Sequence, residues 1–236
     1  MTRISTLGYY SDERQNQIIY NGPTISTGIS IEFTGSNNRL IVSDQARLGR
    51  FTVMFDCDNG ILEIGPSRSV APFTAFIRVG QDSEVKVGAN VSTTATCVIS
   101  AVEGTTVTIG NDVMIASENE IRADDAHPIF DVNTGKRVNL SRDIIIGNHV
   151  WLAKRAVVLG GSKIGSGSVI GFGAVLKGIV PNNCVAAGVP AKVVRRDIAW
   201  ERPHLSRAKP FYKPDGDSVA KTPYWLPTVD EESIHE

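Results

Sequence analysis

Residues 146–181 read IGNHVW, LAKRAV, VLGGSK, IGSGSV, IGFGAV and LKGIVP, which are six consecutive units of six residues. Each unit begins with an aliphatic residue, and a small or β-branched residue follows four places later. Positions spaced by six cannot share one side of an α-helix, because each lies about 120° around the axis from the last. Six residues instead suit one flat side of a three-sided coil, with a short strand along the side and a turn at the corner. The repeat therefore predicts stacked parallel strands.

The repeat extends toward the N-terminus in a less regular form. Hexads recur from Ile109 to Ile121, and the earlier pairs of an aliphatic residue and a glycine are spaced irregularly. Such spacing predicts wider coils that carry loops. We expect three parts: an N-terminal cap over residues 1–29, a solenoid over residues 30–196, and an extension over residues 197–236 that packs on the solenoid or on a neighbouring subunit.

Composition and charge exclude several classes of protein. The 236 residues carry 24 Lys and Arg against 25 Asp and Glu, so the chain lacks the broad positive field of a protein that coats nucleic acid or a membrane surface. No apolar stretch approaches the roughly 18 residues of a membrane span, and residues 1–20 lack the apolar core of a signal peptide, so we expect a cytoplasmic protein. Aromatic residues make up only 7%, which predicts a core of small and β-branched side chains.

Three cysteines, Cys57, Cys97 and Cys184, lie far apart in the chain and form no C-x-x-C pair. An odd number without that spacing supports neither a disulfide framework nor a zinc ribbon. We therefore expect buried free thiols.

The hexads are interrupted once, over residues 122–145. This segment has turn-forming residues near its middle, at 133–135, and it carries Asp124, Asp125, His127 and Asp131. A long loop on a rigid frame is a common place for a functional site, because the frame holds the reactive side chains while the loop supplies them. The segment is the candidate functional region.

Three stretches around this loop resemble the signature of the hexapeptide-repeat acyltransferases. They are DDAHPIFD at 124–131 followed by GKR at 135–137, IGNHVWL at 146–152, and VPNNCVAAGVPAKVV at 180–194. Within that family the chain is most similar to the sugar O-acetyltransferases, including the capsule-polysaccharide, galactoside and maltose branches. The resemblance covers roughly residues 98–196 and implies an all-β fold, the left-handed parallel β-helix. It also implies a homotrimer with its sites at the subunit boundaries, and transfer of an acetyl group from acetyl-CoA to a carbohydrate hydroxyl.

The resemblance assigns His127 as the general base of this reaction. An imidazole has an ordinary pKa of about 6.5, so at neutral pH it is largely free to accept the proton of an attacking hydroxyl. Asp131, or alternatively Asp125, is the candidate to hold the other ring nitrogen. The resemblance also places Trp151 beside the acetyl-transfer site, at a position where the repeat points away from the core.

For acetyl-CoA, the resemblance implies a groove between neighbouring prisms, where backbone amides of stacked turns contact the cofactor. The candidates through their main chain are Ala153, Gly171, Gly173 and Gly188, and the candidate cations for the phosphates are Lys177, Lys192 and Arg195. Lys154 and Phe172 stand where the family has small residues facing the pantetheine arm, and Phe172 is a candidate to stack on the adenine. Lys177 lies one place earlier than the corresponding family lysine, and one place reverses the side of a strand.

Three alternatives stay open from the sequence. The acceptor of the acyl group is an amine in one of them, as in N-acyltransferases of amino sugars or nucleotide sugars. In another, the solenoid is a non-catalytic binding or assembly protein. The third is a metal enzyme like the γ-type carbonic anhydrases, but the solenoid has only His127 and His149 and so lacks the three histidines of that site. We expect no metal, and the sequence does not name the acceptor sugar.

Overall fold

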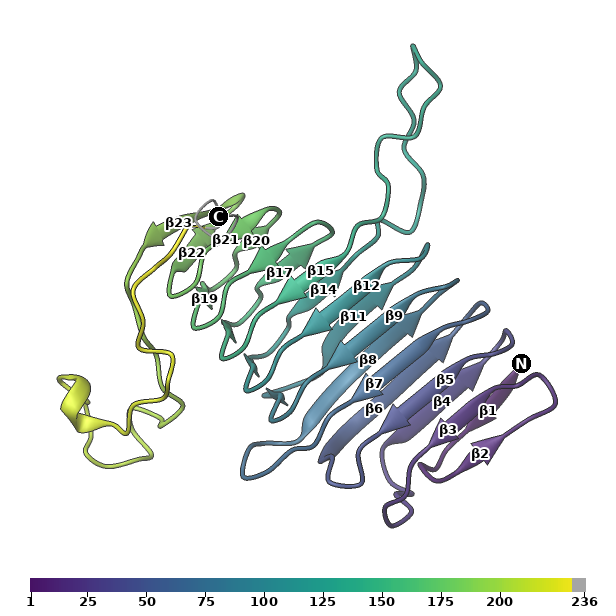
Figure 1. Ribbon diagram of the computed structural model, residues 1–236, viewed down its shortest axis with the longest axis horizontal. Coiled ribbons are helices and arrows are strands. Elements are labelled where there is room, and N and C mark those ends of the chain that lie inside the picture. Colours follow the sequence, from purple (N-terminus) through teal and green to yellow (C-terminus); the bar gives the residue numbers. More distant parts are fainter. Residues whose placement is uncertain (231–236) are drawn as a thin grey trace.

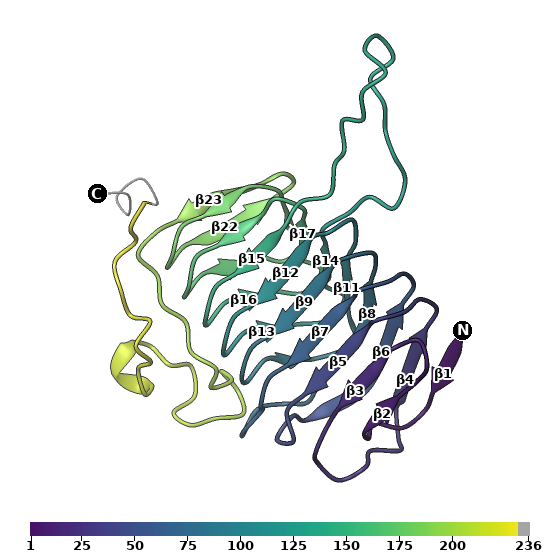
Figure 2. The same ribbon diagram turned by 45° about the vertical axis from the view of Figure 1, so that its right-hand side comes forward.

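The computed structural model of the chain describes residues 1–230, so the last six residues of the predicted extension lie outside the described part. The described chain winds into a rod of short strands, and one loop and the C-terminal extension stand away from it (Figure 1, Figure 2). Only one short helix occurs in this part of the chain, the 3-10 helix η1 (Gly216–Ser218) in the extension. No helix of residues 1–230 is long and apolar enough to cross a membrane. The predicted β-solenoid is confirmed.

Three sheets form the sides of the rod, and we call them face 1, face 2 and face 3. Face 1 consists, in order of pairing, of β1 (Thr2–Ile4), β4 (Ile29–Phe33), β6 (Leu48–Phe55), β8 (Phe73–Val79), β11 (Cys97–Ala101), β14 (Glu120–Arg122), β17 (Val157–Leu159) and β20 (Val175–Leu176). Face 2 consists of β2 (Tyr10–Ser11), β3 (Gln17–Ile19), β5 (Arg39–Val42), β7 (Ile61–Ile64), β9 (Glu84–Val87), β12 (Thr106–Ile109), β15 (Ile144–Ile146), β18 (Lys163–Ile164) and β21 (Ile179–Val180). Face 3 consists of β10 (Ser92–Thr93), β13 (Met114–Ile115), β16 (Trp151–Leu152), β19 (Val169–Ile170), β22 (Val185–Gly188) and β23 (Ala191–Arg195).

The coils stack in register, so that like side chains lie above one another. On face 1, for example, Ile99 pairs with Ile77 on one side and Ile121 on the other. The first residue of each hexad points inward and is buried, as the repeat predicts, and so is the residue four places later. These positions are Ile146, Val150, Leu152, Ala156, Val158, Ser162, Ile164, Ser168, Ile170, Ala174, Leu176 and Val180.

The N-terminal coils are wider than the C-terminal coils. Asn16 and Asn38, which are hydrogen-bonded across neighbouring N-terminal coils, lie 22 residues apart in the chain. Asn148 and Ser166, which are bonded across neighbouring C-terminal coils, lie 18 residues apart. The extra width is filled by fully buried aromatic rings, among which Phe33 and Phe55 stack with their centroids 5.0 Å apart. The expectation that small and β-branched residues fill the interior is therefore right for the narrow coils and wrong for the wide ones.

Antiparallel strands close both ends of the rod. At the N-terminus β1 pairs with β4 and β2 pairs with β3 in antiparallel fashion, while parallel stacking starts where β3 joins β5. Residues 1–29 thus hold the first stacked strand as well as the closing strands. At the other end β23 turns back along β22. Closing strands of this kind cover backbone edges that would otherwise pair with another chain.

The three cysteines are free, with Cys97 and Cys184 buried and Cys57 half-buried. Burial raises the pKa of the Cys97 thiol to about 12, so this side chain stays neutral at physiological pH. The expectation of buried free thiols is confirmed for Cys97 and Cys184, whereas Cys57 is free but only half-buried.

A column of glycines marks one corner of the rod, where successive coils approach most closely. A Cβ added to Gly88 would lie 2.7 Å from the carbonyl oxygen of Gly110, and one added to Gly110 would lie 2.7 Å from the carbonyl of Gly147. Backbone atoms cannot move aside without breaking the ladder between coils. These glycines are therefore required by the stacking.

Replacing Gly110 by alanine should destabilise the rod, because the new methyl group overlaps the next coil. We expect the free energy of unfolding in urea to fall by about 1–3 kcal/mol, the usual cost of overpacking. Gly8→Ala is the control, since its Cβ would lie 3.7 Å from the nearest atom, Oγ1 of Thr24. Equal stability of both variants would contradict the proposed close approach.

Candidate active site

The interrupting loop leaves the rod between β14 of face 1 and β15 of face 2, and it projects as a narrow hairpin (Figure 1). Phe130 and Arg137 form an antiparallel bridge, and the amide of Val138 donates to the carbonyl of Ile129 at 2.9 Å. At the base, the amide of Arg142 donates to the carbonyl of Ala123 at 3.1 Å. The two arms of the loop are thus bonded to each other from base to tip.

His127 lies near the base of this hairpin and is exposed. The preceding residue, Ala126, adopts a left-handed conformation with φ of 61°, and Asp124 caps its amide through Oδ1 at 2.9 Å. The amide of His127 donates to the carbonyl of Asp125 at 2.7 Å. Within residues 1–230 the imidazole makes no hydrogen bond, so both ring nitrogens are open to a ligand or to another chain.

Neither aspartate that the sequence offers as a partner is bonded to the ring of His127 in this chain. Oδ1 of Asp131 accepts from the amides of Asn133 and Thr134 at 2.9 and 2.8 Å, which holds the turn at the hairpin tip. Those hydrogen bonds lower the pKa of Asp131. Oδ2 of Asp125 accepts from Nδ2 of Asn139 at 3.1 Å. The pairing of either carboxylate with the imidazole stays a prediction.

Most of the other predicted site residues lie together on face 3 and at its corner with face 1. Trp151 stacks between Met114 and Val169, and the same column ends in Arg195, which pairs with Val185. Lys192 on β23 pairs with Ala187 on β22, and the preceding residue of β22, Ala186, pairs with Ile170. The remaining candidates follow one of these strands or are its last residue, namely Ala153, Lys154, Gly171, Phe172, Gly173 and Gly188.

Lys177 does not lie with this group. It follows β20 and lines a cavity of about 110 Å³ at the base of the loop, together with Asp125, Asn139 and Arg142. Positions 177 and 178 both lie between β20 and β21, so the shift by one place does not move the lysine to another corner of the rod. In a single chain its ammonium belongs to the surroundings of the hairpin base.

The amides of Ala153, Gly171 and Gly173, which are among the predicted main-chain contacts of CoA, take part in the ladder between coils, and their contact with CoA stays a prediction. These amides donate to the carbonyls of Ile170, Ala186 and Lys154, at 2.8, 2.8 and 3.0 Å. An amide carries one proton, and here the ladder between coils uses it. In the described chain the amides of Lys154 and Phe172, which occupy equivalent corners one coil apart, make no hydrogen bond.

The described part of the C-terminal extension packs against the rod beside face 3 (Figure 2). The ring of Trp200 stacks on buried His149 with centroids 4.1 Å apart and approaches Trp151 to 6.0 Å. His149 bonds through Nδ1 to Asp112 at 2.6 Å and through Nε2 to the carbonyl of Trp200 at 2.9 Å. Half-buried Trp151 is thus covered in part by its own chain, which the sequence did not indicate.

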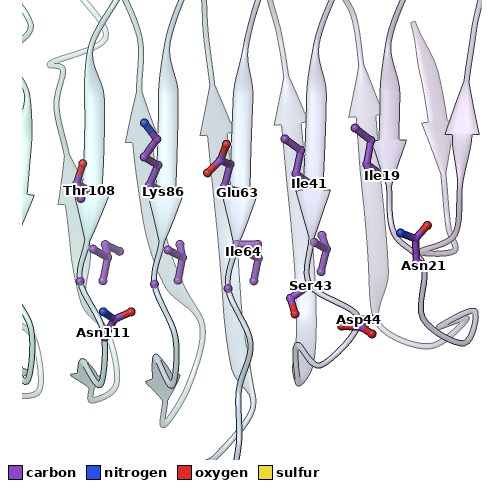
Figure 3. A pocket seen from close by; sticks show the side chains of 16 residues that line it. Ile19, Asn21, Ile41, Ser43, Asp44, Glu63, Ile64, Lys86, Thr108 and Asn111 are labelled. Atoms are coloured by element: carbon purple, nitrogen blue, oxygen red, sulfur yellow. The ribbon is translucent and has the colours of Figure 1, made fainter.

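A wide groove of about 710 Å³ runs along the N-terminal half of face 2, well away from these residues. Figure 3 shows that Ile41, Glu63, Lys86 and Thr108 lie side by side on successive strands along it. Lys86 is the one cation among the described residues that line the groove, and it lies next to Glu63. Neither His127 nor Trp151 lines the groove. The groove therefore does not hold the candidate chemistry. A smaller cavity of about 200 Å³ is lined by Ala126 and Arg137 of the hairpin and by Glu103 of the rod, among other residues.

His127 and Trp151 stand on different sides of one chain. The hairpin leaves at the corner between faces 1 and 2, whereas Trp151 is on face 3. In both views the hairpin projects away from the rod on the side opposite the extension (Figure 1, Figure 2). A single chain therefore holds two separated halves of the predicted site.

Comparison with known proteins connects this arrangement to an enzyme family. The profile described as bacterial transferase hexapeptide (six repeats) matches residues 143–178. The polysialic acid O-acetyltransferase of Neisseria meningitidis is 31% identical over 195 residues, which are 82% of this chain and 89% of that protein. The chain belongs to the hexapeptide-repeat transferase family.

Other members of the hexapeptide-repeat transferase family support the same assignment. The polysialic acid O-acetyltransferase of Escherichia coli O1:K1 is 41% identical over 96 residues, which are 41% of this chain and 31% of that protein. The crystal structure of the polySia-specific acetyltransferase NeuO superposes with a TM-score of 0.69 and 32% identity, covering 86% of this chain and 95% of NeuO. The left-handed parallel β-helix is thereby confirmed, and so is the assignment as an acyltransferase. The non-catalytic alternative is excluded.

An ion pair ties the returning arm of the hairpin to the rod. The guanidinium of Arg137 makes two hydrogen bonds to Glu103, at 2.5 and 2.9 Å, and Oγ of Ser141 adds a third at 2.6 Å. Arg137, and then Ser141, lower the pKa of Glu103 to about 2 from its ordinary 4.5. Because the folded-state pKa is depressed, the contribution of the pair is complete above pH 4.5 and is lost as the pH falls through about 2.

Arg137→Gln should raise the pKa of Glu103 toward its ordinary value of 4.5, since the variant removes the cation that favours the carboxylate. Titration of the side-chain carboxyl carbon by NMR measures this value in both proteins. A wild-type Glu103 that already titrates near 4.5 would show that the pair does not form in solution.

Proposed function

We propose that this acyltransferase moves the acetyl group of acetyl-CoA to a hydroxyl of a carbohydrate by direct transfer, with His127 as the general base. The hydroxyl oxygen bonds to the acetyl carbon as the imidazole of His127 takes the hydroxyl proton. The carbon–sulfur bond then breaks, and the CoA thiolate leaves and receives that proton. The observation that carries the proposal is the exposed imidazole at the base of the hairpin, whose ring nitrogens are unoccupied in residues 1–230.

The similarity to carbohydrate O-acetyltransferases supports the class of acceptor. Two relatives and one solved structure are named for the acetylation of polysialic acid. A polymer of sialic acid is therefore the first acceptor to test, followed by neutral polysaccharides and galactosides. All three names describe O-acetyl transfer or acetyl transfer, which favours a hydroxyl over an amine as the acceptor.

Acetyl-CoA fits the corner between faces 3 and 1. The unpaired amides of Lys154 and Phe172 are two hydrogen-bond donors one coil apart, suited to the carbonyl groups of a pantetheine arm. Lys192 and Arg195 are exposed cations on β23 that can meet the phosphates. The exposed ring of Phe172 offers a surface for the adenine.

A homotrimer joins the two halves of the site. The hairpin exposes five apolar side chains that one chain leaves uncovered, namely Ile129, Phe130, Val132, Val138 and Leu140. An apolar hairpin this long and narrow is costly in water unless a neighbouring chain covers it. We place the hairpin of one subunit against face 3 of the next, so that His127 of one chain approaches Trp151 of its neighbour.

His127→Ala should lower kcat by about 10²- to 10⁴-fold, the usual contribution of a general base, while the KM for acetyl-CoA stays close to that of the wild type. The assay follows release of the CoA thiol with a sialic acid polymer, and then with other sugars, as acceptor. His204→Ala is the control, because His204 is an exposed histidine of the extension. Full activity of His127→Ala would refute the proposed base.

Mixing two inactive variants tests whether the site is shared between chains. His127→Ala and Trp151→Ala should each be nearly inactive alone. Mixed trimers of equal parts should regain about one quarter of wild-type activity, because a quarter of the boundaries then combine an intact hairpin with an intact face 3. Size-exclusion chromatography with light scattering checks the trimer. No recovery in verified mixed trimers would place the whole site within one chain.

A further inference from the structure

Asn139, on the returning arm of the hairpin, bonds directly to the backbone that carries His127. Its Nδ2 donates to the carbonyl of His127 at 2.8 Å and to Oδ2 of Asp125 at 3.1 Å. Its Oδ1 accepts from the amide of Ile129 at 2.7 Å. One side chain thus holds the outgoing arm on both sides of the imidazole.

Asn139 is itself fixed to the rod through Arg137. Nε of Arg137 donates to Oδ1 of Asn139 at 3.2 Å, and its NH2 group donates to the carbonyl of Asn139 at 3.1 Å. The same guanidinium is bound by both carboxylate oxygens of Glu103, which follows β11 of face 1. A continuous line of hydrogen bonds therefore runs from the rigid coil to the carbonyl of His127.

Within a single chain, polar contacts position His127, because the hairpin has no packed core around it. The apolar residues of the hairpin are exposed, with Val132 at 94% and Phe130 at 56%, so the loop has no core of its own. The imidazole has no hydrogen bond within residues 1–230. Its location relative to the rod is therefore set by its backbone, which Asp124 caps on one side and Asn139 holds on the other.

We propose that Asn139 is a positioning residue for acetyl transfer, acting through the backbone of His127. The inference rests on the proposed role of His127 as the base. The position requires an amide side chain, since it must donate to a carbonyl and a carboxylate with one end and accept an amide proton with the other. Aspartate has the same shape and keeps the acceptor, but it places a charged oxygen against the carbonyl of His127 and the carboxylate of Asp125.

Asn139→Asp should therefore lower kcat by about 10- to 100-fold, the scale expected when a reacting group is displaced by about 1 Å. The KM for acetyl-CoA should stay within about twofold, because the predicted cofactor residues other than Lys177 lie on face 3 or at its corner with face 1. Asn139→Ala should lose a similar factor. Asn133→Asp and Asn133→Ala are the matched controls, since the side chain of Asn133 at the hairpin tip makes no hydrogen bond in the described chain.

Amide hydrogen exchange gives a readout that does not depend on activity. Exchange at Ile129 should accelerate in Asn139→Ala, which removes the acceptor of the Ile129 amide, and should not change in Asn133→Ala, while the amides of the rod keep their protection. Wild-type kcat and unchanged exchange in Asn139→Ala would overturn the positioning role. Accelerated exchange with wild-type kcat would also overturn it, because the brace would then be structural only. An inactive wild type with every acceptor would instead refute the proposed function, and the exchange data would still test the brace.

Discussion

Backbone hydrogen bonding from each coil to the next is the interaction on which the rest of this molecule depends. It forces like residues to lie above like, so that a side chain facing inward in one coil faces inward in all of them. It also brings coils so close at the corners that Gly88 and Gly110 have no room for a Cβ. The same ladder uses the amides of Ala153, Gly171 and Gly173, whereas the corner amides of Lys154 and Phe172 make no hydrogen bond within residues 1–230.

A rod built in this way has no concave interior, so reactive groups must be added outside it. The chain does so by leaving the ladder once, between β14 and β15. A loop without a core is held by polar contacts instead of packing, and its three anchors are Glu103, Asp124 and Asn139. The low pKa of Glu103 follows from this arrangement, because the carboxylate accepts two charge-assisted hydrogen bonds from Arg137.

The C-terminal extension is held on the rod by ring stacking and by polar contacts. Face 3 carries Trp151, and the extension brings the ring of Trp200 to 6.0 Å from the Trp151 ring. His149 supports Trp200 from below through ring stacking and through its bond to the carbonyl of the same residue. Arg202 adds contacts to Asp112 and Ser92, so the extension is bonded to three successive coils. His149 thus holds the extension on the rod. In the sequence, His149 and His127 are the two histidines of the solenoid.

The sequence by itself determined the solenoid, the place where it is interrupted and the reactive type of residue in that interruption, because each follows from a short period or a contiguous motif. His127 and Trp151 stand out for that reason. Only the tertiary structure decided which amides are free, that Lys177 lies at the hairpin base, and that the carboxylate of Asp131 holds a turn. It also decided the contacts of Asn139 and Trp200, whose partners Asp125 and His149 lie 14 and 51 residues away. Such contacts have no signature in a local pattern, since they depend on where the chain returns in space.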